Sequence, residues 1–386
     1  MDRDTQPTGG EPLAEDHAIP EVDPASPQLP EPEKPYRGLK WIFVGEQGLR
    51  AGWSMLIFLV LFLVVSSGLA AVFVRLHLLG AGGSLTPRSA LLGELLPVLA
   101  MLAAASVVAL IEGRSILDYN LRGSRRSVHF VSGLAVGFAA LSALVGGLYW
   151  GNWLQFGPVA LSGAQILKYA LIWGCAFLLV GLFEEGTMRC FALFTLTRGL
   201  NFWWAATIIG GVGIRLLTHS KGNGAWGVYA IALMGAIPCL LLHVKRHPDS
   251  GFWQASWVTS TVFGAGHTGN AGEAWIGIFA AAAIGFVFCV SVKLTGSAWW
   301  AIGCHAAWDW GETYFYGTAD SGFVAPGHFL TTSARGNPLW SGGTVGPEGS
   351  LMVVGIILLM LLLLVVVYGR RRPALHPVSA KEQLAS

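Results

Sequence analysis

The chain has 386 residues, of which 53% are hydrophobic and only 12% are charged, and its formal net charge is +2. Soluble domains carry about a quarter charged residues, so this composition and the mean hydropathy of +0.57 exclude an ordinary soluble protein. We predict an all-α membrane protein, a polytopic helical bundle of about 8–10 transmembrane helices with a buried polar site. The lipid bilayer is its first expected partner, and nothing in the composition indicates nucleic acid.

The N-terminal part divides into a polar tail and a group of apolar runs. Residues 1–50 are rich in Pro, Glu and Asp and poor in aliphatic side chains, which predicts a disordered or interfacial tail. Residues 51–160 contain apolar runs at 53–74, 90–111 and 130–150. Each run is long enough to cross about 30 Å of hydrocarbon, so we expect N-terminal transmembrane helices here.

The second part of the chain, residues 161–316, is the expected catalytic membrane core. Its apolar runs lie at 167–196, 202–217, 226–244, 252–266, 275–292 and 297–316. The similar stretches that begin at Asn201 and Gly251 suggest an inserted helical hairpin at about 205–250. We expect residues 317–350, rich in Gly, Ser and Pro, to form an outer cap or flap, residues 351–369 a last transmembrane helix and residues 370–386 a basic cytoplasmic tail.

The positive residues indicate the orientation of the chain. Most Lys and Arg fall in alternate connections between the apolar runs, including Arg125 and Arg126 and the cluster 370–372 after the last run. Cytoplasmic loops carry the excess of Lys and Arg, so both termini are expected in the cytoplasm. We expect an integral protein of a bacterial-type inner membrane.

Two carboxylates and a guanidinium interrupt the apolar run at 167–196. A charged side chain at bilayer depth costs at least ~2.5 kcal/mol, so Glu184, Glu185 and Arg189 require pairing, water or a chemical role. Glu185 and Arg189 are four residues apart and share a helix face, which predicts an ion pair. Glu184 points about 100° away from Glu185 and is available to a cavity as a general base or acid.

Two further polar motifs lie in later apolar runs. His267 ends a run four residues after Phe263, and His305 and Asp309 are four residues apart on one helix face. Taken alone, His267 reads as an interfacial residue, and the pair His305 and Asp309 reads equally well as a structural hydrogen bond between helices. Together with Glu184, these side chains are more economically explained by one convergent intramembrane site.

In this order, the motifs resemble the signature of the CPBP family of intramembrane proteases, also called the CAAX protease or Abi family. The signature is EExxxR, FxxxH and then HxxxN or HxxxD, and the resemblance covers roughly residues 167–316. It implies an all-helical membrane core and a water molecule activated for peptide hydrolysis. The residues that carry it are Glu184, Glu185, Arg189, Phe263, His267, His305 and Asp309.

The resemblance also implies roles for these residues. Glu184 would be the general base, and His267 would help to hold the water or a metal. Glu185, which belongs to the catalytic set, would fix the geometry of the first motif together with Arg189, and Arg189 and Phe263 would give structural support. His305 and Asp309 would stabilise the oxyanion. A carboxylate donates a hydrogen bond only when protonated, so a role for Asp309 in orienting His305 or a metal is equally open.

No cofactor follows with certainty from the sequence. A divalent metal such as zinc, held by Glu184, His267 and His305, stays an open alternative, and the chain has no HExxH pair that would argue for it by spacing. The favoured function is an intramembrane endopeptidase that acts on a membrane-associated or lipidated protein or peptide substrate.

Two alternatives belong to other classes. The first is a non-proteolytic immunity or scaffold protein in which the polar groups only hold helices together. The second is a proton-coupled transporter, which would be expected to show inverted repeats or broken helices in matching halves. The substrate, its cleavage site and the oligomeric state do not follow from the sequence.

Overall fold

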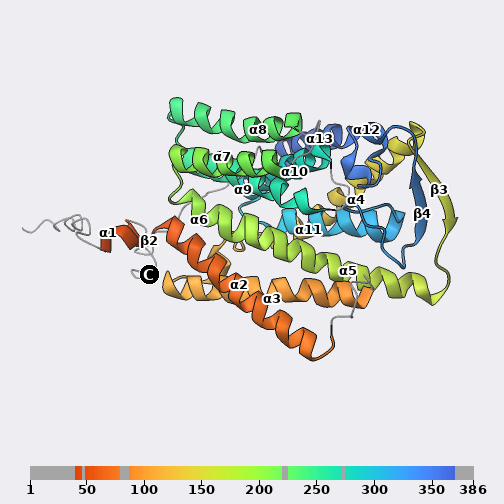
Figure 1. Cartoon of the computed structure of the whole chain (residues 1–386), viewed down its shortest axis with the longest axis horizontal. Coiled ribbons are helices and arrows are strands. Elements are labelled where there is room, and N and C mark those ends of the chain that lie inside the picture. Colours follow the sequence, from red (N-terminus) through yellow and green to blue (C-terminus); the bar gives the residue numbers. More distant parts are fainter. Residues whose placement is uncertain (1–39, 46–47, 79–86, 220–224, 271–273, 370–386) are drawn as a thin grey trace, which may run out of the picture.

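The protein is a polytopic helical membrane protein (Figure 1). The structure is a computed structural model, and it describes residues 40–45, 48–78, 87–219, 225–270 and 274–369. The predicted tails at 1–39 and 370–386 lie outside the described residues. The rest of the N-terminal segment forms a short helix, α1 (Lys40–Phe43), and a hairpin of β1 (Val44–Gly45) and β2 (Gly48–Leu49).

Each apolar run predicted from the sequence lies in a helix. Within the described residues, five helical runs are long and apolar enough to cross a membrane. They are α2 (Ala51–Arg75), α3 (Pro87–Ile111), α4 (Arg126–Trp150), α10 (Trp275–Thr295), and the continuous run of α5 (Ala164–Glu185), η2 (Gly186–Ala192) and α6 (Leu193–Thr197). The shorter helices are α7 (Phe202–His219), α8 (Ala225–Val244), α9 (Ser250–Gly266), α11 (Trp299–Asp309) with η5 (Trp310–Tyr316), and α13 (Met352–Tyr368).

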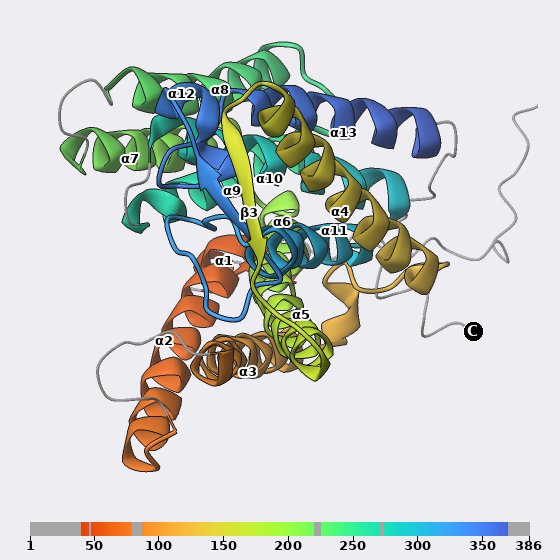
Figure 2. The same cartoon turned by 90° about the vertical axis from the view of Figure 1, so that its right-hand side faces the viewer.

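The helices are arranged around α5, α9, α10 and α11. Helices α2 and α3 pack together on one side of this group, and α7 and α8 pack together on the other, next to α9 (Figures 1 and 2). Most described residues of the segment 205–250, where a helical hairpin is predicted, therefore lie in α7 and α8 at the edge of the bundle, and residues 220–224 between these helices lie outside the described residues. That it is an insertion stays a prediction.

Helices α4 and α11 approach closely because glycines face one another. A Cβ on Gly133 or Gly137 of α4 would lie 2.2 Å from the carbonyl oxygen of Trp300 or Cys304, respectively. A Cβ on Gly303 of α11 would lie 2.3 Å from a carbonyl oxygen of α4. Small residues at such an interface let helix backbones touch in a membrane protein. The contact fixes the position of α11, which carries His305.

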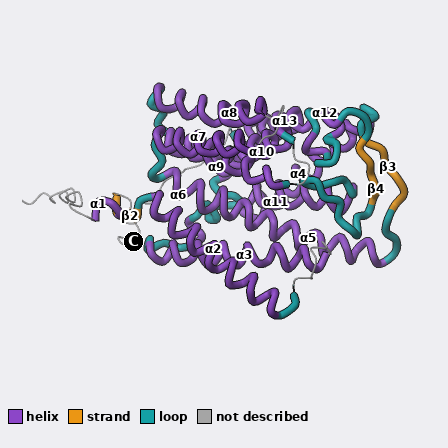
Figure 3. Tube along the Cα trace, in the orientation of Figure 1, coloured by secondary structure: helices purple, strands orange, loops and turns teal. Residues whose placement is uncertain are grey.

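A small sheet adds to the predicted helices. The strands β3 (Leu154–Val159) and β4 (Leu330–Ala334) pair antiparallel, with Leu154 opposite Ala334 (Figure 3). The sequence analysis did not predict this sheet, because Gly157 and Pro158 weaken the local strand signal and the partner strand is far away in sequence. Segment 317–350 supplies β4 to this sheet and also contains α12 (Pro338–Ser341) and η6 (Pro347–Gly349).

Candidate functional site

A π-helical turn follows the two adjacent carboxylates. Helix α5 ends at Glu185, and the wider turn η2 then includes Arg189 before the helix resumes as α6. Such turns insert one extra residue into a helix and occur frequently at functional sites. The continuous run from Ala164 to Thr197 thus changes its winding where the polar side chains lie.

Glu185 and Arg189 form the ion pair predicted from their spacing. Arg189 Nη1 lies 3.2 Å from Glu185 Oε1, and both side chains are 0% exposed. The guanidinium also packs over the rings of Phe263, at 4.3 Å, and Phe288, at 5.4 Å. A Cβ on Gly285 would lie 2.5 Å from Arg189 Nη2, so a glycine leaves the space that the guanidinium fills. The pair ties η2 to α9 and α10.

His305 lies among three carboxylates. Its Nδ1 is 2.8 Å from Glu185 Oε1, and its Nε2 is 3.6 Å from Glu184 Oε2 and 3.4 Å from Asp309 Oδ2. An ionised carboxylate only accepts hydrogen bonds, so Nδ1 donates to Glu185 and Nε2 is left for Glu184 and Asp309. Glu185 Oε1 therefore serves both His305 and Arg189.

His267 is oriented by its own helix. Its Nδ1 donates to the carbonyl oxygen of Phe263 at 2.9 Å, and its ring packs at 4.8 Å from the Phe263 ring. This bond fixes the tautomer of the neutral ring, since the other nitrogen, Nε2, must then be the acceptor. Phe263 thus positions both His267 and Arg189.

The predicted residues meet at one cavity of about 230 Å³. Glu184, His267, His305 and Asp309 line it, whereas Glu185 lies behind His305 and is fully buried. Glu184 Oε2 is buried and has no hydrogen-bond partner among the described residues. The structure therefore separates a carboxylate that faces the cavity from one that supports the site.

A shared metal does not fit Glu184, His267 and His305 as they stand. These three side chains do not offer ligand atoms that all lie within 4.8 Å of one another, whereas a second set of described residues does. That set is Glu312, Asp320 and Glu348.

The sequence interpretation missed this second acidic set. Glu312 is fully buried in η5, three residues after Asp309, and an acidic residue inside an apolar run was the available signal. Asp320 and Glu348 line the same cavity as Glu184, at the side formed by segment 317–350. Burial, followed by the nearby Glu348 carboxylate, raises the pKa of Asp320 to about 7. The Asp320 carboxyl group is therefore more easily protonated than an ordinary aspartate.

Comparison with known proteins identifies one related family. Residues 166–311 match the family model described as type II CAAX prenyl endopeptidase Rce1-like. No curated protein and no solved structure matches the chain. The matched segment contains every residue of the three predicted motifs and ends before Glu312.

Proposed function

On the premise that residues 166–311 form an Rce1-like domain, which suggests an intramembrane protease, we propose that this chain is an intramembrane endopeptidase. It hydrolyses a peptide bond in a membrane-associated or lipidated protein or peptide. One observation carries the proposal: the cavity brings Glu184, His267, His305 and Asp309 together from three separate helices.

Glu184 is the general base in this proposal. Its side chain lines the cavity and is 29% exposed, and its Oε2 has no hydrogen-bond partner among the described residues, so the carboxylate can accept a proton from water. As the water oxygen bonds to the scissile carbonyl carbon, its proton passes to Glu184. Glu184 then gives this proton to the leaving amine when the C–N bond breaks, the usual exchange of base and acid roles.

His305 stabilises the oxyanion. With Nδ1 donating to Glu185 at 2.8 Å, the protonated ring presents Nε2–H toward the cavity. Asp309, at 3.4 Å from Nε2, favours the charged ring and is better suited to orienting His305 than to donating to the oxyanion itself. The loss of one oxyanion donor costs about 10²–10³ in kcat.

His267 positions the attacking water. Its Nδ1 is engaged by the Phe263 carbonyl, which leaves Nε2 as an acceptor at the cavity. A water molecule that donates one hydrogen to His267 and the other to Glu184 has its lone pair directed at the substrate. Geometric restraint of this kind contributes to the rate by lowering the entropy cost of attack.

The substrate class follows from the lining of the cavity and from the family name. Apolar side chains, including Phe177, Val353 and Ile357, surround the polar groups, and such a lining suits a lipid or an apolar peptide segment. The matched family is named for CAAX prenyl endopeptidases. We therefore propose a prenylated C-terminal peptide as the first substrate to test.

The test uses the full chain in lipid nanodiscs with a farnesylated CAAX peptide and the same peptide without the lipid, and mass spectrometry of the products. We expect cleavage by the wild type, with Glu184→Gln and His305→Ala each slower by at least about 10²-fold. Asp249→Asn is the matched control, because Asp249 pairs with Lys293 away from the cavity and is half exposed. Unchanged cleavage by Glu184→Gln in folded protein would rule the mechanism out.

The scaffold alternative predicts a different result. If the polar groups only hold helices together, Glu184→Gln preserves the cellular phenotype, because glutamine keeps a polar side chain of the same size 3.6 Å from His305 Nε2. Comparison of the phenotype with peptide cleavage by the same variant therefore separates the two functions.

A further inference from the structure

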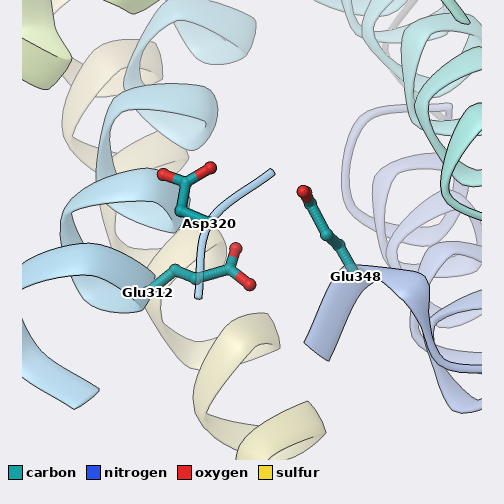
Figure 4. A group of neighbouring side chains, drawn as sticks. All are labelled: Glu312, Asp320 and Glu348. Atoms are coloured by element: carbon teal, nitrogen blue, oxygen red, sulfur yellow. The ribbon is translucent and has the colours of Figure 1, made fainter. Parts of the chain in front are cut away.

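Three carboxylates from separate segments meet beside the cavity. Glu312 comes from η5, Asp320 from the start of segment 317–350, and Glu348 from η6 just before α13. Each offers one oxygen, and these three oxygens lie within 4.8 Å of one another. Figure 4 shows the Glu312 and Glu348 side chains extending toward the same space from opposite sides.

Glu312 supplies an independent indication of a ligand. The residue is 0% exposed, its Oε2 accepts a hydrogen bond from Trp308 Nε1 at 3.0 Å, and its Oε1 has no partner among the described residues. A buried charged acceptor without a partner is costly, and its unpaired oxygen calls for a proton or a cation.

Neutral donors surround the cluster. Thr313 Oγ1 donates to Asp320 Oδ2 at 2.8 Å, and Ser321 donates from its backbone N and its Oγ to Glu348 Oε1 at 3.0 and 3.1 Å. These hydrogen bonds orient the carboxylates, but they do not balance the negative charge that the three groups carry when ionised. A divalent cation would both orient the carboxylates and balance their negative charge.

The donor set selects the type of cation. All three groups are carboxylate oxygens, which suit a hard cation, whereas zinc in proteins favours nitrogen and sulfur ligands. Calcium accepts six to eight oxygens in flexible geometry and needs no octahedral cage. Segment 317–350 is predicted to face the outer side of the membrane, where calcium modules work with dissociation constants of about 10⁻⁴–10⁻³ M.

We propose that Glu312, Asp320 and Glu348 bind one calcium ion that fastens segment 317–350 to η5 and to the start of α13. The ion would hold one wall of the cavity in place, because Asp320 and Glu348 line it. This structural site is separate from the proposed reaction at Glu184, and it lies beyond the segment that matches the protease family.

The test measures ion binding directly, with ⁴⁵Ca²⁺ equilibrium dialysis of the chelator-treated full chain in nanodiscs. We expect one saturable calcium site in the wild type and at least about a tenfold loss of affinity in Asp320→Asn and in Glu348→Gln, since affinity follows the number of charged ligands. Asp249→Asn changes an acidic residue outside the cluster, at the start of α9 and paired with Lys293, and should bind as the wild type does. No saturable binding in the wild type, or unchanged affinity in both variants, would overturn the proposal.

A second readout does not depend on the variants folding normally. Calcium at a hundred times its dissociation constant should raise the folded-to-unfolded ratio of the wild type about a hundredfold and slow hydrogen exchange within 317–350. An equal response to magnesium would show general charge screening and refute calcium selectivity. A wild type that does not respond to calcium, while Glu312→Gln is more stable, would show that the cluster shares protons instead.

Discussion

Glu185→Gln tests whether the buried ion pair of Glu185 and Arg189 stabilises the fold around the site. The substitution keeps the side chain's shape and an acceptor oxygen for His305 Nδ1, which lies 2.8 Å from Glu185 Oε1 in the wild type. It removes the negative charge that faces Arg189 at 3.2 Å, where both side chains are 0% exposed. The variant therefore leaves a buried guanidinium without a balancing charge.

The expected loss of unfolding free energy depends on the lost ion pair and on the contacts that Arg189 keeps. Removal of one partner from a buried ion pair costs about 3–5 kcal/mol. Arg189 keeps its contacts with the faces of Phe263 and Phe288, and cation–π contacts contribute about 0.5–2 kcal/mol each. Because the guanidinium still has these contacts in the variant, we expect a loss of unfolding free energy at the lower end of this range, near 3 kcal/mol. This corresponds to about a hundredfold change in the folded-to-unfolded ratio.

Chemical denaturation of the purified chain in detergent micelles measures this loss. Glu184→Gln is the matched control, an identical chemical change one residue earlier on a side chain that is 29% exposed, and we expect less than about 1 kcal/mol for it. The double variant Glu185→Gln/Arg189→Met should regain much of the stability, because no unbalanced charge remains. Equal stability of the two single glutamine variants would refute the ion-pair argument.

Two glycine substitutions test how closely the site is packed. Each is compared with a control substitution at a glycine where the added Cβ would have no atom within 4 Å. Gly285→Ala places a Cβ 2.5 Å from Arg189 Nη2 and should lower the unfolding free energy by about 1–3 kcal/mol, whereas Gly210→Ala in α7 should be neutral or stabilising in the same denaturation assay. Gly137→Ala should force α4 from the α11 backbone and reduce peptide cleavage by at least about tenfold, while Gly146→Ala in the same helix should not; equal activity of the pair would contradict the role of that contact.

The sequence predicted the helices and the main polar pair well, because both depend on local patterns. Apolar runs of membrane length have few alternatives to helix in a bilayer, since every backbone group must be satisfied within the segment. The spacing of Glu185 and Arg189 is likewise a local property of one helix, and the ion pair is present. The catalytic roles of Glu184 and the histidines remain proposals.

Features that depend on distant segments were not predictable in this way. The β3–β4 pairing joins Leu154 to Ala334, and no local pattern records such a partner. The acidic set depends on the path of segment 317–350, which brings Asp320 and Glu348 back to Glu312. The hydrogen bond from His305 to Glu185 was also missed, because helical spacing within α11 favours Asp309 as the partner of His305.

One carboxylate oxygen couples the stability of the bundle to the geometry of the site. Glu185 Oε1 accepts from Arg189, which packs against α9 and α10, and from His305, which belongs to α11. Any change that moves this oxygen must disturb the ion pair and the orientation of the imidazole together. Glu184 takes no part in either bond, so we expect its substitution to leave both bonds and the fold in place. Adjacent glutamates on one helix therefore differ in consequence because only one of them faces away from the cavity.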